Sequence, residues 1–182
     1  MRLVAGRHRG RLLVAPPGRI ARPTADRVRQ ALFDVLAHTD LVELEGAVVV
    51  DAFAGSGALG LEALSRGAAA CTFLDSATAA LECTRRNAAT LREEARASMI
   101  RADALKPPPA REPATLAFLD PPYGRDLPGP ALTALAAHGW FCPGAVIVVE
   151  TSAQDVLPPL PFCELLDERR YRLTVVRFLR LT

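Results

Sequence analysis

Cysteine, lysine and long apolar runs are scarce in this sequence, and each scarcity argues against a class of protein. The four cysteines contain no C-x-x-C pair, and none has a histidine at metal-ligand spacing, so neither structural zinc nor a disulfide framework is expected. No apolar run approaches the roughly 18 residues that span a membrane. The N-terminus, MRLVAGRHRGR, carries charge where a signal peptide needs an apolar segment. We therefore expect a cytoplasmic protein with no metal and no membrane contact.

Arginine replaces lysine almost throughout: of the 22 basic residues, Lys106 alone is not an arginine. Residues 1–30 hold eight arginines against one acid, a net charge of +7, whereas the remainder carries 14 basic and 19 acidic residues, a net charge of −5. A basic segment on an acidic body is typical of proteins that bind a polyanion. We expect a basic extension, residues 1–40, on a main domain, residues 41–182, in a monomeric protein.

Two apolar segments near the N-terminus, residues 2–5 and 11–15, flank GRHRG and predict a β-hairpin with an arginine-rich tip. Thr24 is expected to cap a helix that ends near residue 37. The spacing of its apolar residues predicts a buried face made of Val28, Leu32, Val35 and Leu36, with Arg27 and Arg29 off that face.

From residue 47 onward, apolar strand-like runs alternate with helical patterns. Strands are expected at 47–51, 70–75, 98–102, 115–120 and 145–151, helices at 58–67, 77–96 and 127–138, and a terminal hairpin at 163–171 and 172–180. This alternation predicts an α/β, Rossmann-like fold with a mostly parallel sheet of seven strands and a C-terminal antiparallel hairpin. Ligands of such sheets bind at the C-terminal ends of the strands.

A glycine-rich loop, VVVDAFAGSGALG (48–60), contains a G-x-G-x-x-G sequence between a predicted strand and a predicted helix. Asp75 lies twenty residues after Gly55, where a carboxylate holds ribose hydroxyls in dinucleotide-binding proteins. Asp51 argues against NAD, because it would repel a pyrophosphate by ~4 kcal/mol per charge pair at ~4 Å. Its carboxylate instead suits the ammonium and sulfonium groups of S-adenosylmethionine.

The cofactor contacts are therefore expected along the ends of the first three strands. The candidates are Asp51, Phe53, Ala54, Gly55, Ser56 and Gly57 in the loop, Asp75 and Ser76 after the second strand, and Asp103 and Ala104 after the third. Asp103 is placed to accept from the adenine amino group, although a solvated loop acid is an equally good interpretation of that residue. No G-K-[ST] follows the glycines, which excludes a P-loop.

The segment FLDPPYGRD (118–126) places Asp120 at the end of the fourth strand, followed by Pro121, Pro122 and Tyr123. The prolines restrict the backbone and lack N–H groups, so Asp120 and the Pro121 carbonyl form two fixed acceptors. Two acceptors suit the exocyclic amino group of a base, with Tyr123 stacked on the ring. A surface turn is the alternative for this segment alone. The three histidines are isolated and are interpreted as surface or cap residues, and Arg125 is unassigned.

Three segments in order, RPTADRVRQALFDVL (22–36), DAFAGSGALGLEALSRGA (51–68) and DPPYG (120–124), resemble the bacterial 16S ribosomal RNA guanine-N2 methyltransferase family. The resemblance implies a class I S-adenosylmethionine-dependent methyltransferase fold. It implies S-adenosylmethionine as cofactor, catalysis by Asp120, Pro121, Pro122 and Tyr123, and Arg22 and Thr24 near the methionine end.

The same resemblance implies a partner, 16S rRNA in the small ribosomal subunit or its assembly intermediate. Arg7, Arg9, Arg11 and Arg27 of the basic extension would then contact RNA. One departure concerns the end of the chain, where the family often has Tyr-Gly and this sequence has Tyr171-Arg172.

Other functions compete with a guanine-N2 methyltransferase. An adenine-N6 or protein-amide methyltransferase uses related motifs, but the chain offers no segment for a DNA target-recognition domain. A non-catalytic RNA-binding assembly factor would not need the acids and the tyrosine at the strand ends. An NAD-dependent oxidoreductase is disfavoured by Asp51. Which guanine is modified depends on the fit of the whole ribosomal particle.

Overall fold

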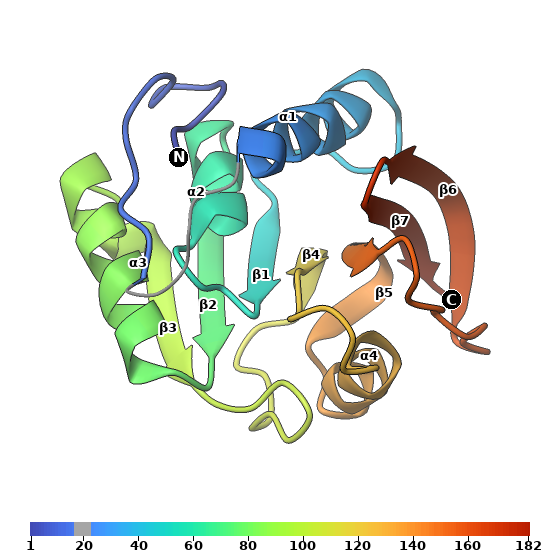
Figure 1. Cartoon of the computed structure of the whole chain (residues 1–182). Helices are drawn as coiled ribbons and strands as arrows, with labels where there is room; N and C mark the ends of the chain where they lie inside the picture. The colour runs from blue at the N-terminus through green and yellow to red at the C-terminus, as the bar shows by residue number, and fades with distance from the viewer. Residues whose placement is uncertain (17–22) are drawn as a thin grey trace.

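A seven-stranded sheet forms the centre of the computed structural model, which describes residues 1–16 and 23–182 (Figure 1). The strand order is β3-β2-β1-β4-β5-β7-β6. The strands are β1 Val48–Ala52, β2 Ala70–Asp75, β3 Ala97–Arg101, β4 Ala114–Leu119, β5 Phe141–Ser152, β6 Cys163–Tyr171 and β7 Thr174–Leu181. Strands β1 to β5 pair in parallel, and β7 runs antiparallel to both of its neighbours. The predicted mostly parallel sheet with a C-terminal antiparallel hairpin is confirmed.

Helices cover both faces of the sheet. The helices are α1 Pro23–His38, α2 Ala58–Ser65, α3 Thr78–Leu91 and α4 Pro128–Ala137, with a short 3₁₀ helix, η1, at Glu94–Arg96. Helices α1 to α3 lie on one face and α4 on the other (Figure 1). Side chains of a strand point alternately to opposite faces. Accordingly Leu116 and Phe118 of β4 pack under α1 and α2, whereas Ala117 and Leu119 pack on the α4 side.

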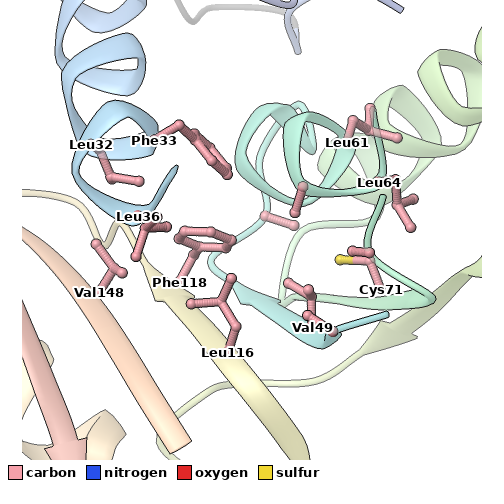
Figure 2. Close-up of a cluster of buried hydrophobic side chains, with 14 of the residues drawn as sticks. Leu32, Phe33, Leu36, Val49, Leu61, Leu64, Cys71, Leu116, Phe118 and Val148 are labelled. Carbon is pink, nitrogen blue, oxygen red and sulfur yellow. The ribbon is translucent and has the colours of Figure 1, made fainter. Parts of the chain in front are cut away.

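The core on the α1–α3 face contains the four phenylalanines that are fully buried. Phe33 of α1 and Phe118 of β4 place their ring centroids 5.3 Å apart, within reach of a tilted aromatic contact. Leu32 and Leu36 extend this contact along α1, and Leu61 and Leu64 extend it over α2 (Figure 2). This packing fixes the strand ends that carry the predicted acids.

Several predicted boundaries are wrong. The helix predicted at 77–96 ends at Leu91, because Arg92 adopts a left-handed conformation with φ of 58° and closes the helix. Helix α1 begins at Pro23, which suits the first position of a helix, so Thr24 lies inside the helix and is not its N-cap. Arg29, expected off the buried face, is 4% exposed and donates to Asp26 and to the Arg2 carbonyl. The fifth strand begins earlier than expected, at Phe141.

The N-terminal hairpin forms, but few backbone hydrogen bonds join its two segments. A single bridge joins Arg2 to Leu12, and the Leu3 and Leu13 N–H groups donate to Arg11 and Met1 carbonyls at 3.0 Å each. No longer strand is present in residues 1–16, so the expected strands at 2–5 and 11–15 are reduced to this bridge. Leu3 and Leu13 are buried in the core of the α1–α3 face.

Two buried acids hold the tip of this hairpin. Glu62 of α2 accepts from the Val4 and Ala5 N–H groups at 2.8 and 3.0 Å. Gly6 approaches the Ser65 carbonyl so closely that a Cβ on Gly6 would lie 1.9 Å from its oxygen. Glu93, 4% exposed, pairs with His8 and Arg7 at the end of α3. The expectation that His8 is a surface or cap residue is therefore wrong.

The position of the tip follows from the direction of α2 and α3. Each helix begins beside the C-terminal ends of the strands and runs back toward the opposite edge. Because Ser65 and Glu93 lie at or beyond the C-terminal ends of these helices, the tip sits at the opposite edge. An α2 of 8 residues spans about 12 Å. The arginine-rich tip is therefore separated from the glycine-rich loop by that length.

Position 172, where this sequence has arginine in place of glycine, lies in the turn between β6 and β7. Arg172 has a φ of 36°, in the left-handed region, and Tyr171 pairs with Thr174 across a two-residue turn. Such a turn favours glycine at its first central residue. A glycine fits this conformation without strain, whereas an arginine adopts it at a cost of about 1–2 kcal/mol.

Within the described residues, no helix is long and apolar enough to cross a membrane. The same residues hold no group of three or more His, Cys, Asp or Glu side chains that could bind a metal ion.

Candidate active site

Acidic residues line the C-terminal edge of the sheet on five adjacent strands. Ala52 of β1 pairs with Leu74 of β2 and Leu119 of β4, so Asp75 and Asp120 flank the loop that leaves β1. Neighbouring strands lie about 4.8 Å apart, which puts these two backbone positions about 10 Å from each other. Asp103 follows β3, Asp51 lies in β1 and Glu150 lies in β5. The sheet therefore brings together the acids that the sequence predicted, and adds Glu150, which it did not.

The glycine-rich loop is held by side chains from β2 and α3. Asp75 accepts from the Gly55 and Ala77 N–H groups at 2.9 and 2.8 Å, one with each oxygen. From α3, Asn87 donates to the Ser56 carbonyl at 2.8 Å, and the Thr84 hydroxyl donates to the Gly55 carbonyl at 3.2 Å. Sequence reasoning missed both α3 residues. Their signal is a polar side chain on the helix face that also carries Leu81, Ala88 and Leu91.

Close packing of α2 on β2 requires glycine at position 60, the third glycine of the loop. The strained backbone of Phe53 sets the shape of the loop. A Cβ on Gly60 would lie 2.4 Å from Phe73 and 2.5 Å from Cys71, so only glycine lets α2 pack this closely on β2. Phe53 has a φ of 68°, a conformation that is uncommon outside glycine and that recurs at functional sites. The loop thus turns sharply over the end of β1.

Asp51 lies beneath this loop rather than on its surface. The residue is 2% exposed and its carboxylate accepts from the Gly60 N–H at 2.9 Å. Burial raises the pKa of Asp51 to about 8, the Gly60 N–H opposes the shift, and the negative charge of Asp75 adds to it. A cation bound above the loop would stabilise the ionised form of Asp51.

Replacing Asp51 with asparagine is expected to change how the free energy of unfolding depends on pH. The folded protein has an Asp51 pKa of about 8, and the unfolded chain returns to 3.8. Between these values the folded state holds a proton that the unfolded state releases, so wild-type stability falls as pH rises from about 4 to about 8. The advantage of Asp51→Asn should grow by up to about 1 kcal/mol per pH unit in that window.

Denaturant unfolding from about pH 5 to about pH 9 measures this difference. Asp40→Asn, an exposed exchange of the same type, is the matched control and should show a difference that stays constant with pH. A constant difference for Asp51→Asn as well would mean that its carboxylate is ionised in the folded protein throughout.

The remaining predicted cofactor residues fall into two groups. Ala54, Gly55, Ser56, Gly57 and Ala104 are buried, so their backbone rather than their side chains can face a ligand. Ser76 and Asp103 are exposed and Phe53 is half-buried. Asp103 accepts from the Leu105 N–H at 2.9 Å, closing a local turn. The structure thus gives Asp103 a turn-forming role that is compatible with either sequence interpretation.

The segment after β4 is tied to the neighbouring strands through its tyrosine. Tyr123 donates its hydroxyl hydrogen to Glu150 at 2.7 Å, and its oxygen lies 3.2 Å from the Thr174 hydroxyl of β7. Burial, followed by the charge of Glu150, raises the pKa of Tyr123, so the hydroxyl stays protonated. Asp120 is half-buried, Pro121 buried and Pro122 exposed. The aromatic ring is therefore anchored at its hydroxyl end, beside Asp120.

Arg7, one of the predicted RNA-binding arginines, is held at the hairpin tip, away from this edge. The Arg7 guanidinium pairs with Glu93 at 3.0 Å and donates to the Leu64 carbonyl at 3.2 Å. Arg9, Arg11 and Arg27 are exposed. Arg22 lies outside the described residues, as does the side chain of Thr24.

Known proteins resemble this chain in both sequence and structure. The family model described as "Conserved hypothetical protein 95" matches residues 1–180. "Ribosomal RNA small subunit methyltransferase D" of Escherichia coli is 38% identical over 162 residues, covering 88% of this chain and 79% of that protein. "Putative rRNA methyltransferase YlbH" of Bacillus subtilis is 35% identical over 87% of this chain and 86% of its own length. The solved "Putative methyltransferase yhhF" of E. coli superposes with a TM-score of 0.84 at 35% identity, covering 100% of this chain and 97% of that one.

The strand order, the glycine-rich loop after β1 and the acids at the strand ends define a class I S-adenosylmethionine-dependent methyltransferase fold. The predicted fold class is therefore confirmed. Within that class, the chain belongs to the "Conserved hypothetical protein 95" family, that of the ribosomal RNA small subunit methyltransferase D proteins, as its three motifs indicated.

Proposed function

We propose that the protein transfers a methyl group from S-adenosylmethionine to the exocyclic N2 amino group of a guanine in 16S rRNA of the small ribosomal subunit. The observation that carries the proposal is the line of Asp75, Asp51 and Asp120 on three adjacent strands, with Tyr123 anchored beside the last. The kinship to ribosomal RNA small subunit methyltransferase D supports rRNA as the substrate class.

S-adenosylmethionine fits this edge in one direction. Asp75 uses its two oxygens for backbone N–H groups, and its remaining lone pairs can accept from the ribose hydroxyls. The adenine then lies toward Asp103 and Ala104 after β3. The methionine end lies toward the loop at residues 53–57, with Asp51 beneath it. This direction leaves the sulfonium near β4, where Asp120 stands.

The DPPY segment supplies the chemistry on the acceptor side. Asp120 and the Pro121 carbonyl accept from the two hydrogens of the guanine amino group and favour the pyramidal nitrogen that attacks the methyl carbon. S-adenosylmethionine would supply the methyl group, its carbon–sulfur bond breaking as the carbon–nitrogen bond forms, and the proton that the nitrogen loses would pass to water. The negative charge of Asp120 stabilises the positive charge that develops on the nitrogen. Tyr123 stacks on the base and holds it in line.

The partner in this proposal is 16S rRNA in the small subunit or an assembly intermediate, met in the cytoplasm by a monomeric protein. The basic extension, residues 1–40, docks on RNA through Arg9, Arg11 and Arg27, which are exposed. Arg7 contributes less than its charge suggests, because Glu93 already pairs with it.

Transfer of labelled methyl to small subunits from a strain that lacks this gene tests the proposal. Mass spectrometry of the digested RNA should show N2-methylguanosine. N6-methyladenosine in its place would establish the adenine alternative. Failure of the protein to bind S-adenosylmethionine, with or without RNA, would support a non-catalytic assembly factor.

A further inference from the structure

A groove of about 430 Å³ opens directly beside the DPPY segment. Residues 124–126 and Pro128, after β4, form one wall, and residues 154–156, after β5, form the other. In the strand order, β5 lies on the side of β4 away from β1 and its glycine-rich loop. The groove is therefore separate from the cofactor position, and its volume lies within the range of small-molecule sites.

The groove walls are fastened to each other and to the anchored tyrosine. Asp155 accepts from the Gly124 and Ser152 N–H groups at 3.3 and 3.2 Å. The Ala153 N–H donates to the Leu173 carbonyl at 3.0 Å, and Thr174, the next residue, contacts the Tyr123 hydroxyl. One set of bonds thus joins the loops after β4 and β5 to the β6–β7 turn.

The side chains around the groove offer apolar surface and one cation. Val156 of the groove wall is 79% exposed, one of the five exposed large hydrophobic side chains among the described residues. Arg125 is exposed and forms no ion pair within residues 1–16 and 23–182. Two acids, Asp126 and Asp155, also line the groove. The Asp155 carboxylate accepts from backbone N–H groups, so the exposed carboxylate of Asp126 is the negative charge that opposes Arg125.

We propose that this groove holds the nucleotide next to the target guanine in the RNA chain, an inference that rests on the proposed function. A base can reach Asp120 and Tyr123 only after leaving its stack, and its neighbour then loses a stacking partner. Val156 offers that neighbour an apolar surface, and Arg125 offers its phosphate a cation. The arginine-rich hairpin tip cannot do this, because it is fixed at the opposite edge of the sheet.

Kinetics with small subunits provide the first test. Arg125→Ala and Val156→Asp should each raise KM for the particle about tenfold, while the affinity for S-adenosylmethionine changes less than about twofold. Arg125→Ala should also reduce the slope of log K against log[salt] by about 1. Arg111→Ala is the matched control, because Arg111 is exposed on the loop between β3 and β4, beside the opposite ends of β2 and β3.

A photo-crosslinker in place of Val156 provides the second test and should mark the nucleotide adjacent to the methylated guanine. Unchanged KM in both groove variants, or a crosslink to a distant nucleotide, would overturn the proposal even though the unaltered protein methylates RNA normally. Absence of methyl transfer by the unaltered protein would instead overturn the proposed function, so the two failures are distinguishable.

Discussion

Methyl transfer by an Asp120→Asn variant is expected to be roughly 100- to 1,000-fold slower than by the unaltered protein, with nearly unchanged affinity for S-adenosylmethionine. Asparagine keeps the shape of the side chain and one acceptor oxygen, but it removes the negative charge opposite the developing ammonium. That charge matters most in the transition state, so the loss should fall on kcat rather than on KM. Single-turnover transfer to small subunits, with calorimetry for the cofactor, measures both quantities.

Glu112→Gln, another exchange of a carboxylate for an amide, is a suitable control, because the residue is exposed on the loop between β3 and β4 and lies outside the proposed machinery. A near-normal rate in Asp120→Asn would remove this carboxylate from the chemistry. A loss of S-adenosylmethionine affinity equal to the loss of rate would mean that Asp120 acts by binding the cofactor.

The sheet and the order of the site were predictable because they depend on local patterns. Buried parallel strands appear as short apolar runs, and a carboxylate at the end of each run lies at one edge of the sheet whatever the loops do. The positions of Asp75 and Asp120 could be predicted from this rule and the spacing of the glycines alone. The pairing of β1 with both β2 and β4 then placed them on either side of the loop.

The contacts that were missed join residues far apart in the chain. Glu62 bonds to Val4, 58 residues away, and Glu93 bonds to His8, 85 residues away. A glutamate in a helix normally indicates a solvated face, and no pattern near Glu62 shows that it is fully buried. The contact of Asn87 was missed for a related reason, because its partner is a backbone carbonyl of the glycine-rich loop, which is distant in the sequence.

Charge counting over a segment also has a physical limit. The +7 of residues 1–30 predicted a polyanion partner, yet Arg7 and Arg29 each have an acidic partner in the folded protein. In the proposed function RNA meets only the exposed charge, to which Arg9, Arg11 and Arg27 contribute. The tip lies away from the acids at the strand ends, because Glu62 and Glu93 hold it at the opposite edge of the sheet. In the proposed function the hairpin therefore has a docking role, and residues beside Tyr123 contact the target nucleotide.

The affinity for S-adenosylmethionine should fall about 100-fold in an Asp75→Ala variant, the opposite pattern to Asp120→Asn. The carboxylate of Asp75 shapes the loop through the Gly55 N–H and is placed to accept from the ribose, so both effects are lost together. Calorimetry with a 2′,3′-dideoxy analogue of the cofactor separates them. If the ribose contact dominates, the analogue should bind the variant and the unaltered protein almost equally, because the interaction is already absent in both. An undiminished difference would assign the effect to loop shape alone, and unchanged affinity for the natural cofactor would place the ribose elsewhere on the edge.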